Sequence, residues 1–148
     1  MRVEAMVREL IGVCSSGVHA VRLGTVIKVV EGIILGGKLS PATIGRSLRG
    51  SASPKHEIKR VDRLLGNPRM TVDRVSLFLA VAHRLLRGAE RPVILVDWTQ
   101  SCGTHVALVA AVPIGGRALP IYVEVHPLKK LGNVAIESRF LRTLKTIV

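Results

Sequence analysis

The chain has 148 residues, of which 48% are hydrophobic, and it carries a formal net charge of +12. This composition excludes an intrinsically disordered chain and suffices for one ordinary domain or two small ones. The excess of positive charge favours a polyanionic partner, with nucleic acid ahead of an anionic membrane surface, over a protein that is merely basic.

Two helices are predicted before residue 38. Apolar residues recur at helical spacing over 2–13 and over about 18–35, and a pair of glycines ends the second helix. Helix pairs of this kind usually form a packing scaffold, so we assign them no chemistry.

Residues 40–66 are a helix-turn-helix candidate. Ser40-Pro41 is typical of a helix start, with Ser as the cap and Pro at the first helical position. The resulting short helix, 41–48, is followed by a turn and by a second helix over 55–65. A basic second helix after a turn is typical of helix-turn-helix DNA-binding proteins, although this loop is longer than the tight form.

The second of these helices carries basic residues off its apolar stripe, which is predicted to be Ile58, Val61, Leu64 and Leu65. Residues 38–74 contain nine Lys or Arg and three Asp or Glu, which is half of the excess charge of the chain. Such cations can contact phosphates or base edges. The alternative is a solvated face on which Glu57 and Asp62 form local ion pairs. The predicted DNA-binding residues are Arg46, Arg49, Lys55, Lys59, Arg60 and Arg63.

A further helix is predicted over 72–86, capped by Thr71. The connection after it is rich in turn-forming residues, and basic residues become sparse beyond it. We therefore predict a helical domain over 1–90 and a second domain over 91–148.

The second domain is predicted to begin with a strand. Val93–Val96 is an uninterrupted β-prone apolar run, which predicts a strand buried on both faces. Asp97 follows the run, and a carboxylate at the end of a buried strand is well placed to bind a metal ion. Asp97 is therefore the candidate catalytic and metal-binding residue.

The remaining elements predict an antiparallel meander and a closing helix. The next two strands are expected over 105–114 and 118–126, joined by a hairpin turn at Gly115-Gly116. Ile121, Val123 and Val125 alternate with Tyr122 and Glu124 along the third strand. The helix is predicted over 135–147, with five residues facing inward: Ile136, Phe140, Leu141, Leu144 and Ile147.

Membrane insertion and cysteine chemistry are not favoured. The uncharged stretch 98–116 contains His105 and Pro113 and does not resemble a spanning helix, and the N-terminus lacks the layout of a signal peptide. We expect a cytoplasmic chain. Cys14 and Cys102 are too far apart in the sequence for a typical zinc motif, and we expect both to be small buried residues.

Three segments, 56–67 (HEIKRVDRLLGN), 95–99 (LVDWT) and 117–128, resemble segments of the DDE transposases of bacterial insertion sequences, the cut-and-paste kind, with fitting mutual spacing. The resemblance covers nearly the whole chain. It implies an α+β fold, in which an N-terminal helical DNA-binding domain precedes the first three strands and first helix of a ribonuclease-H-like catalytic domain. It also implies a nucleoid-associated protein that binds double-stranded DNA at terminal inverted repeats, with a possible oligomer on DNA.

In such transposases, Asp97 would be the first carboxylate of an Asp-Asp-Glu triad that binds two divalent ions, usually Mg²⁺. The second Asp of the family follows a fourth strand, and the Glu lies on a later helix. Glu124 and Glu137, the acidic residues after Asp97, match neither position and are expected to be structural or solvent-facing. One carboxylate does not hold two metal ions. We therefore expect a transposase fragment that is inactive alone and does not bind Mg²⁺ productively.

Two alternatives remain open. One is a non-enzymatic DNA-binding regulator of transposition that uses residues 38–74. A weaker one is a small metal-dependent nuclease in which several subunits each contribute Asp97. In a fragment without the fourth strand, the Val93–Val96 edge would be exposed, so residues 91–148 alone are expected to be poorly soluble.

The residues near Asp97 each have a structural and a functional interpretation. Trp98 could stack on an unpaired base, but we prefer a packing role at the strand end. Thr99 and Gln100 are expected near the same open end. His105 and His126 lie near strand ends without ligand spacing, so they receive no metal-binding role.

Overall fold

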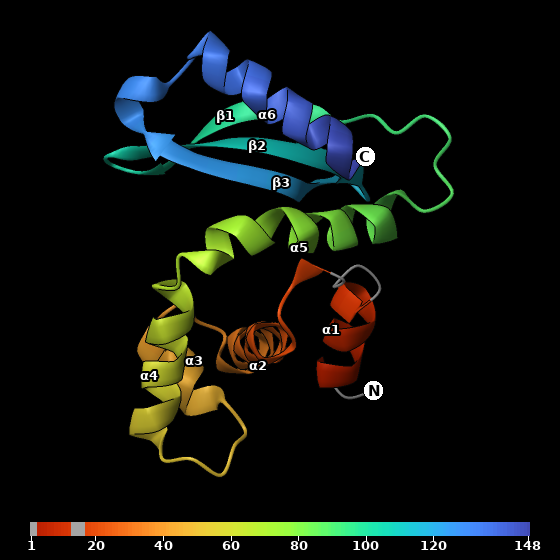
Figure 1. The fold of residues 1–148 in the computed structure, drawn as a ribbon. Coiled ribbons are helices and arrows are strands. Elements are labelled where there is room, and N and C mark those ends of the chain that lie inside the picture. Colours follow the sequence, from red (N-terminus) through yellow and green to blue (C-terminus); the bar gives the residue numbers. More distant parts are fainter. Residues whose placement is uncertain (1–2, 13–16) are drawn as a thin grey trace. The chain divides into compact units, whose positions relative to one another are not determined.

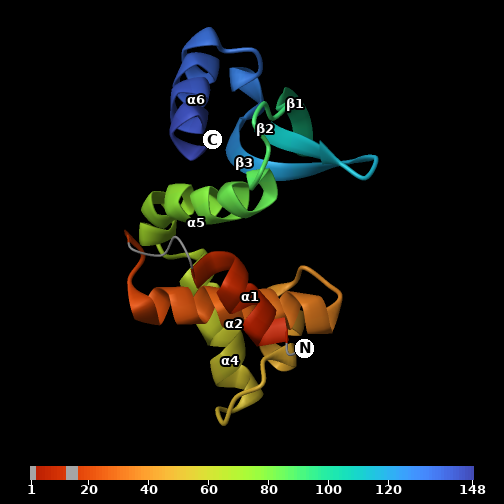
Figure 2. The same ribbon diagram turned by 90° about the vertical axis from the view of Figure 1, so that its right-hand side faces the viewer.

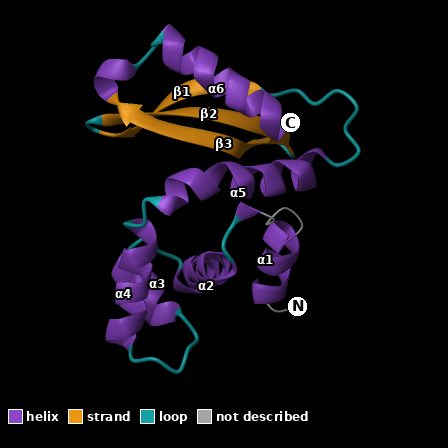
Figure 3. Cartoon of the chain, viewed as in Figure 1, coloured by secondary structure: helices purple, strands orange, loops and turns teal. Residues whose placement is uncertain are grey.

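The computed structural model describes residues 3–12 and 17–148. In this part of the chain the fold is α+β, with six α-helices and one three-stranded antiparallel sheet (Figures 1 and 3). Its contacts divide it into two compact units, unit 1 over residues 1–77 and unit 2 over residues 78–148. The division falls within α5 (Arg69–Leu86), whereas the sequence placed a boundary near residue 90, in the connection after that helix.

Unit 1 is a set of helices around an aliphatic core. Its helices are α1 (Val3–Gly12), α2 (Ala20–Gly36), α3 (Pro41–Ser47), α4 (Pro54–Leu65) and the first part of α5. The core combines one face each of α2, α3 and α4, through Val26, Val29, Ile44, Val61 and Leu64. Leu65, predicted to be part of the apolar stripe, is exposed. Leu64 already occupies the buried position of that turn, and the next residue is rotated about 100° away from it.

Of the two helices of the candidate motif, α3 begins as its cap predicts, whereas Ser53, the expected cap of α4, makes no side-chain capping hydrogen bond. The Ser40 hydroxyl accepts a hydrogen bond from the Thr43 N–H at 3.1 Å, and Pro41 occupies the first turn of α3. Thr71, in contrast, lies inside α5 and does not cap it. Asn67 takes that place, because its Oδ1 accepts the Arg69 N–H at 3.0 Å and satisfies a donor of the first turn.

The crossing of α3 and α4 depends on Gly45. A Cβ atom at this position would lie 2.5 Å from the Ile58 Cα and 2.7 Å from the Ile58 nitrogen. Both atoms are backbone and cannot move aside as a side chain would. A residue without a side chain therefore sets the close approach of the two helices in the predicted motif.

Unit 2 contains the predicted antiparallel meander, β1 (Leu95–Cys102), β2 (His105–Ile114) and β3 (Arg117–Pro127), in spatial order β1-β2-β3. Gly115 and Gly116 form the second hairpin turn with φ values of 58° and 76°. Two consecutive positive φ angles match the twist of the flanking strands and favour glycine at both positions. The expected turn is thus confirmed.

A bulge interrupts the alternation predicted for β3. Ala110 pairs with Tyr122 and Ala111 pairs with Pro120, so Ile121 is an extra residue on β3. As a result the adjacent residues Ile121 and Tyr122 are both buried. Beyond the bulge Glu124 is buried and Val125 is exposed. The polar residue therefore faces inward and the apolar residue outward, the opposite of what the alternation predicts.

Helix α6 (Val134–Ile147) covers one face of the sheet, as two perpendicular views show (Figures 1 and 2). Asn133 caps it by accepting the Ile136 N–H at 3.1 Å. The Tyr122 ring lies 4.8 Å from the Phe140 ring and 5.4 Å from the Phe78 ring, centroid to centroid. These rings form the aromatic centre of unit 2. Leu141, predicted to face inward, is exposed.

The strand that carries Asp97 differs from the sequence prediction. β1 lies at an edge of the sheet, and Val93, Leu95 and Val96 are exposed. The prediction of a strand buried on both faces was therefore wrong, because these apolar residues lie exposed at the edge of the sheet. Asp97 does not end the strand, since pairing with β2 continues beyond it to Cys102. The apolar run marked only the start of the strand, because hydrogen bonding to β2 does not require apolar side chains.

Two smaller expectations have mixed outcomes. Cys102 is exposed at the end of β1, which contradicts its predicted burial, and Cys14 lies outside the described residues. Within the described ranges, every helix is too short or too polar to cross a membrane.

Candidate functional site

Helix α4 carries a line of exposed cations. Lys55, Lys59 and Arg63 follow one another at intervals of four residues, so they lie along one side of the helix. Val61 and Leu64 are buried on the other side. We call these three cations the α4 stripe. The local sequence produces it because the apolar and basic residues of α4 repeat with the same helical period but out of phase.

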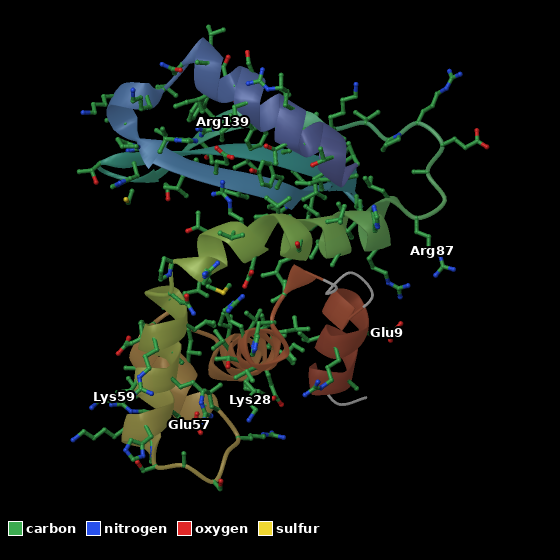
Figure 4. The ribbon with its side chains drawn as sticks, in the orientation of Figure 1. Glu9, Lys28, Glu57, Lys59, Arg87 and Arg139 are labelled. Atoms are coloured by element: carbon green, nitrogen blue, oxygen red, sulfur yellow. The ribbon has the colours of Figure 1, made fainter. Side chains whose placement is uncertain are left out.

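The α4 stripe is not neutralised by neighbouring acids. Among the residues that the structure describes, no ion pair involves Lys55, Lys59 or Arg63. Asp62 is exposed next to the stripe and has no ion pair either within those residues. Figure 4 shows Lys59 and Glu57 on opposite sides of α4. The outward face of α4 therefore keeps its positive charge.

Glu57 and Arg60 form the local ion pair that the sequence left open. Glu57 is only 2% exposed, and both of its carboxylate oxygens accept from Arg60 Nη1, at 2.8 and 2.6 Å. Arg60 is thus held on the flank of α4 and lies apart from the stripe. It remains a candidate for DNA contact, but through its other N–H groups.

The other two predicted DNA-binding residues lie before α4. Arg46 is in the last turn of α3 and Arg49 is in the loop that follows, and both are exposed. The structure places them in the same compact unit as the α4 stripe.

A hollow of about 620 Å³ lies between α2 and α4. Its lining is rich in cationic and titratable groups: His19, Arg22, His56, Arg60 and Arg63. A second hollow of about 270 Å³ shares Val21, Thr25 and Arg60 with the first and adds Arg8 and Lys28. We call the two together the α2–α4 hollow. Sequence reasoning identified Arg60 and Arg63 but missed the α2 residues, because no local pattern indicates which face of α2 meets α4.

A second buried carboxylate holds Arg22 at this hollow. Asp73 of α5 is 4% exposed, and it accepts from Arg22 Nε and, at 3.2 Å, from Arg22 Nη2. The hydrogen bond from Arg22 lowers the pKa of the Asp73 carboxyl below its usual value, against the opposing effect of burial, and the same contact raises the pKa of Arg22. Both groups therefore stay charged over a wide pH range.

In unit 2, Asp97 is exposed on β1 and pairs with Val109 of β2. It alternates with Trp98, so the two side chains leave the strand on opposite faces. Trp98 turns toward α6, where its Nε1 donates to Glu137 Oε1 at 2.7 Å. The packing role preferred for Trp98 thus agrees with the structure. Thr99 and Gln100 are exposed beside it.

Glu124 is the centre of a polar network beneath α6. It is 4% exposed, its Oε1 accepts from the Tyr122 hydroxyl at 2.6 Å, and its Oε2 accepts from Arg139 Nη2 at 3.1 Å. His126 Nε2 lies 3.1 Å from the same Oε2, and the His126 ring packs edge-on against Trp98. The structural interpretation of Glu124 and Glu137 is therefore supported. His105, at the hairpin between β1 and β2, contacts Thr104.

These carboxylates do not fit a two-metal site. Among the described residues, no group of three or more His, Cys, Asp and Glu side chains could hold a metal ion. Glu124 accepts hydrogen bonds from Tyr122 and Arg139. Glu137 accepts from Trp98 and lines a hollow of about 290 Å³ together with Asp97, but two carboxylates there fall short of a triad. We accordingly derive no cleavage step through Mg²⁺ from this arrangement.

Comparisons with known proteins leave the family open. No family model, no curated protein and no solved structure matches this chain.

Proposed function

We propose that this chain binds double-stranded DNA through unit 1, as a helix-turn-helix protein whose α4 meets the DNA. The observation that carries the proposal is the α4 stripe, whose three cations are exposed and form no ion pair with an acid of the described residues. Cations in this arrangement neutralise phosphates and release the counterions of DNA, which supplies most sequence-independent affinity.

The architecture around α4 supports the same proposal. Helix α3 crosses α4 at the close contact of Gly45 with Ile58, and Arg46 and Arg49 add exposed charge at the end of α3. A short helix fixed against a basic helix is what a helix-turn-helix motif requires, since the first helix orients the second in the major groove.

We further propose that the chain derives from DDE transposases and that its DNA is the terminal inverted repeat of an insertion sequence. The order of three antiparallel strands followed by a helix agrees with the start of a ribonuclease-H-like domain, and Asp97 lies on the first strand. Among the described residues, no group of three or more acidic, His or Cys side chains completes a metal site with Asp97. The chain by itself is then a DNA-binding regulator or the DNA-binding part of a larger assembly.

The first test replaces the α4 stripe. The triple variant Lys55→Ala, Lys59→Ala, Arg63→Ala should bind a short random-sequence duplex more weakly than the wild type. The slope of log affinity against log salt should become shallower by about 3, because about 0.9 counterion is released per phosphate contact. The measurement is fluorescence anisotropy of labelled duplex over a range of salt concentrations.

The matched control removes three exposed charges from unit 2, in the variant Lys129→Ala, Arg142→Ala, Lys145→Ala. Both variants lower the net charge by the same amount, so a general electrostatic effect would weaken them equally. Equal affinity and equal salt slope of the two variants would refute the assignment to α4.

A second test concerns catalysis. Purified chain incubated with duplex DNA and Mg²⁺ should give no cleavage, because the described carboxylates do not form a two-metal site. Cleavage by the wild type that disappears in Asp97→Asn would contradict this part of the proposal and favour the oligomeric nuclease.

A further inference from the structure

The α2–α4 hollow has the composition of an anion site. In the part of the chain that the structure describes, its lining includes cationic Arg and Lys, neutral Thr25 and Asn67, and no Asp or Glu. Glu57 and Asp73, the carboxylates that hold Arg60 and Arg22, are buried and are not lining residues. The hollow thus presents positive charge, and the compensating carboxylates lie beneath it.

The buried acids also orient the arginines. Glu57 occupies Nη1 of Arg60, and Asp73 occupies Nε and Nη2 of Arg22. A guanidinium has five N–H donors, so each arginine keeps donors that these carboxylates do not use. Arginines held in this way lose less conformational entropy when an anion binds, which makes the remaining donors more effective.

One neutral group of the lining adds a donor, and another does not. The Thr25 hydroxyl donates its proton to the Val21 carbonyl at 2.9 Å, so it offers no donor to a phosphate. Asn67 uses its Oδ1 for the Arg69 N–H, which leaves its amide N–H₂ as a donor. Arg and Asn side chains both belong to the groups that contact nucleic-acid phosphates.

We propose that the α2–α4 hollow binds phosphates of a DNA backbone, so that α4 contacts the duplex on its outward stripe and on its flank toward α2. Arg63 belongs to both surfaces and makes them continuous. A volume of about 620 Å³ is larger than one phosphate group requires and gives room for a sugar-phosphate segment. The inference rests on the proposed DNA binding and adds a second contact surface to it.

The test places a negative charge at the rim of the hollow. Val21 lines both parts of the hollow and is 73% exposed, so Val21→Glu should repel phosphates without disturbing the core. The matched control is Val72→Glu, which adds the same charge near the start of α5, at a residue that is 67% exposed and does not line the hollow. Relative to Val72→Glu, we expect Val21→Glu to bind random-sequence duplex about tenfold more weakly, with a salt slope shallower by about 1.

A second variant guards against a folding effect of the first. Asn67→Asp adds a charge inside the hollow without adding an atom, and it keeps the oxygen that accepts the Arg69 N–H. It should weaken duplex binding in the same direction. Thermal melting of each variant, followed by circular dichroism, checks that unit 1 remains folded.

The outcomes separate this inference from the function on which it rests. If Val21→Glu and Asn67→Asp bind as Val72→Glu does, while the α4 triple variant is weakened, the hollow is not a DNA contact and DNA binding by α4 stands. If the wild type does not bind duplex at all, both are overturned. If the hollow variants lose affinity for inorganic tripolyphosphate and keep it for duplex, the site takes a small free anion, and the backbone assignment is wrong.

Discussion

The two units use buried carboxylates in different ways. In unit 1, Glu57 and Asp73 hold two arginines at the α2–α4 hollow and leave the α4 stripe without acidic partners among the described residues. In unit 2, Glu124 accepts from a tyrosine and an arginine within one network under α6. The first arrangement leaves a cationic surface, and the second fixes a helix to a sheet. A buried acid is therefore evidence of an oriented partner, and the partner decides whether the result is a binding surface or a packing contact.

The largest expected effect tests whether the crossing of α3 and α4 in unit 1 is needed for the fold that presents the α4 stripe. Gly45→Val should destabilise unit 1 by about 3 kcal/mol or more, because the added Cβ meets the Ile58 backbone and overpacked cores are costly. DNA binding should be lost with the fold. Denaturant unfolding followed by circular dichroism measures the change.

The control is Gly24→Ala, because a Cβ at Gly24 meets no heavy atom within 4 Å of it. This substitution, in the interior of α2, should raise stability by about 0.5 to 1 kcal/mol through helix propensity and the unfolded-state entropy. If both glycine variants behaved alike, the close approach at Gly45 would not matter for the fold.

A smaller effect compares one buried acid from each unit, Glu124 of unit 2 and Glu57 of unit 1. Glu124→Ala should cost about 2 to 3 kcal/mol, because it removes the acceptor of several hydrogen bonds in a buried site. Glu57→Ala should cost less, about 1 to 2 kcal/mol, since Arg60 is half-exposed and water can replace its partner. Denaturant titration gives both values, and the reverse order would contradict the comparison.

The smallest effect is a pH dependence carried by Asp73 and Arg22. The pKa of Asp73 is lower in the folded chain than the value of about 3.9 for an unfolded Asp, so the folded state binds fewer protons between the two values. The stabilisation from this ion pair is then fully present above about pH 4 and is lost as the pH falls through the folded pKa. The raised pKa of Arg22 leaves this acid range unaffected.

The corresponding measurement is denaturant unfolding of the wild type and Asp73→Asn at a series of pH values. The wild type should be more stable at neutral pH, and the two curves should converge on acidification. A difference that persisted at the acid end would show that the Arg22 contact is not its source.

Local sequence signals predicted where helices and turns form better than they predicted which residues are buried. Ser40 and the Gly115-Gly116 pair act within a few residues of themselves, through a cap and a turn, and both behave as predicted. The prediction of a buried strand at Val93–Val96 was wrong. Burial of a strand depends on its neighbours in the sheet, and β1 has a neighbouring strand on one side only. An apolar run indicates a strand without indicating its place in the sheet.

The candidate site could be predicted in part. Helical periodicity placed Lys55, Lys59 and Arg63 off the apolar stripe of α4, as the structure has them. It could not indicate that Arg60 is held by a buried Glu57, or that Arg22 on α2 meets Asp73 across more than 50 residues, because both depend on tertiary contacts. The bulge at Ile121 likewise changes which residues of β3 are buried, and Pro120 beside it is a local signal that the alternation alone did not use.

The aromatic rings of the chain have one more consequence. Every Phe, Tyr and Trp of the sequence, at positions 78, 98, 122 and 140, falls in unit 2. Near-ultraviolet absorbance and intrinsic fluorescence therefore report on unit 2 alone, and unit 1 is optically silent outside the peptide bands. A duplex that touched unit 1 only would leave the emission of Trp98 unchanged. A change in that emission would mean that bound DNA influences the second unit as well, so one unlabelled titration distinguishes a local from a shared response.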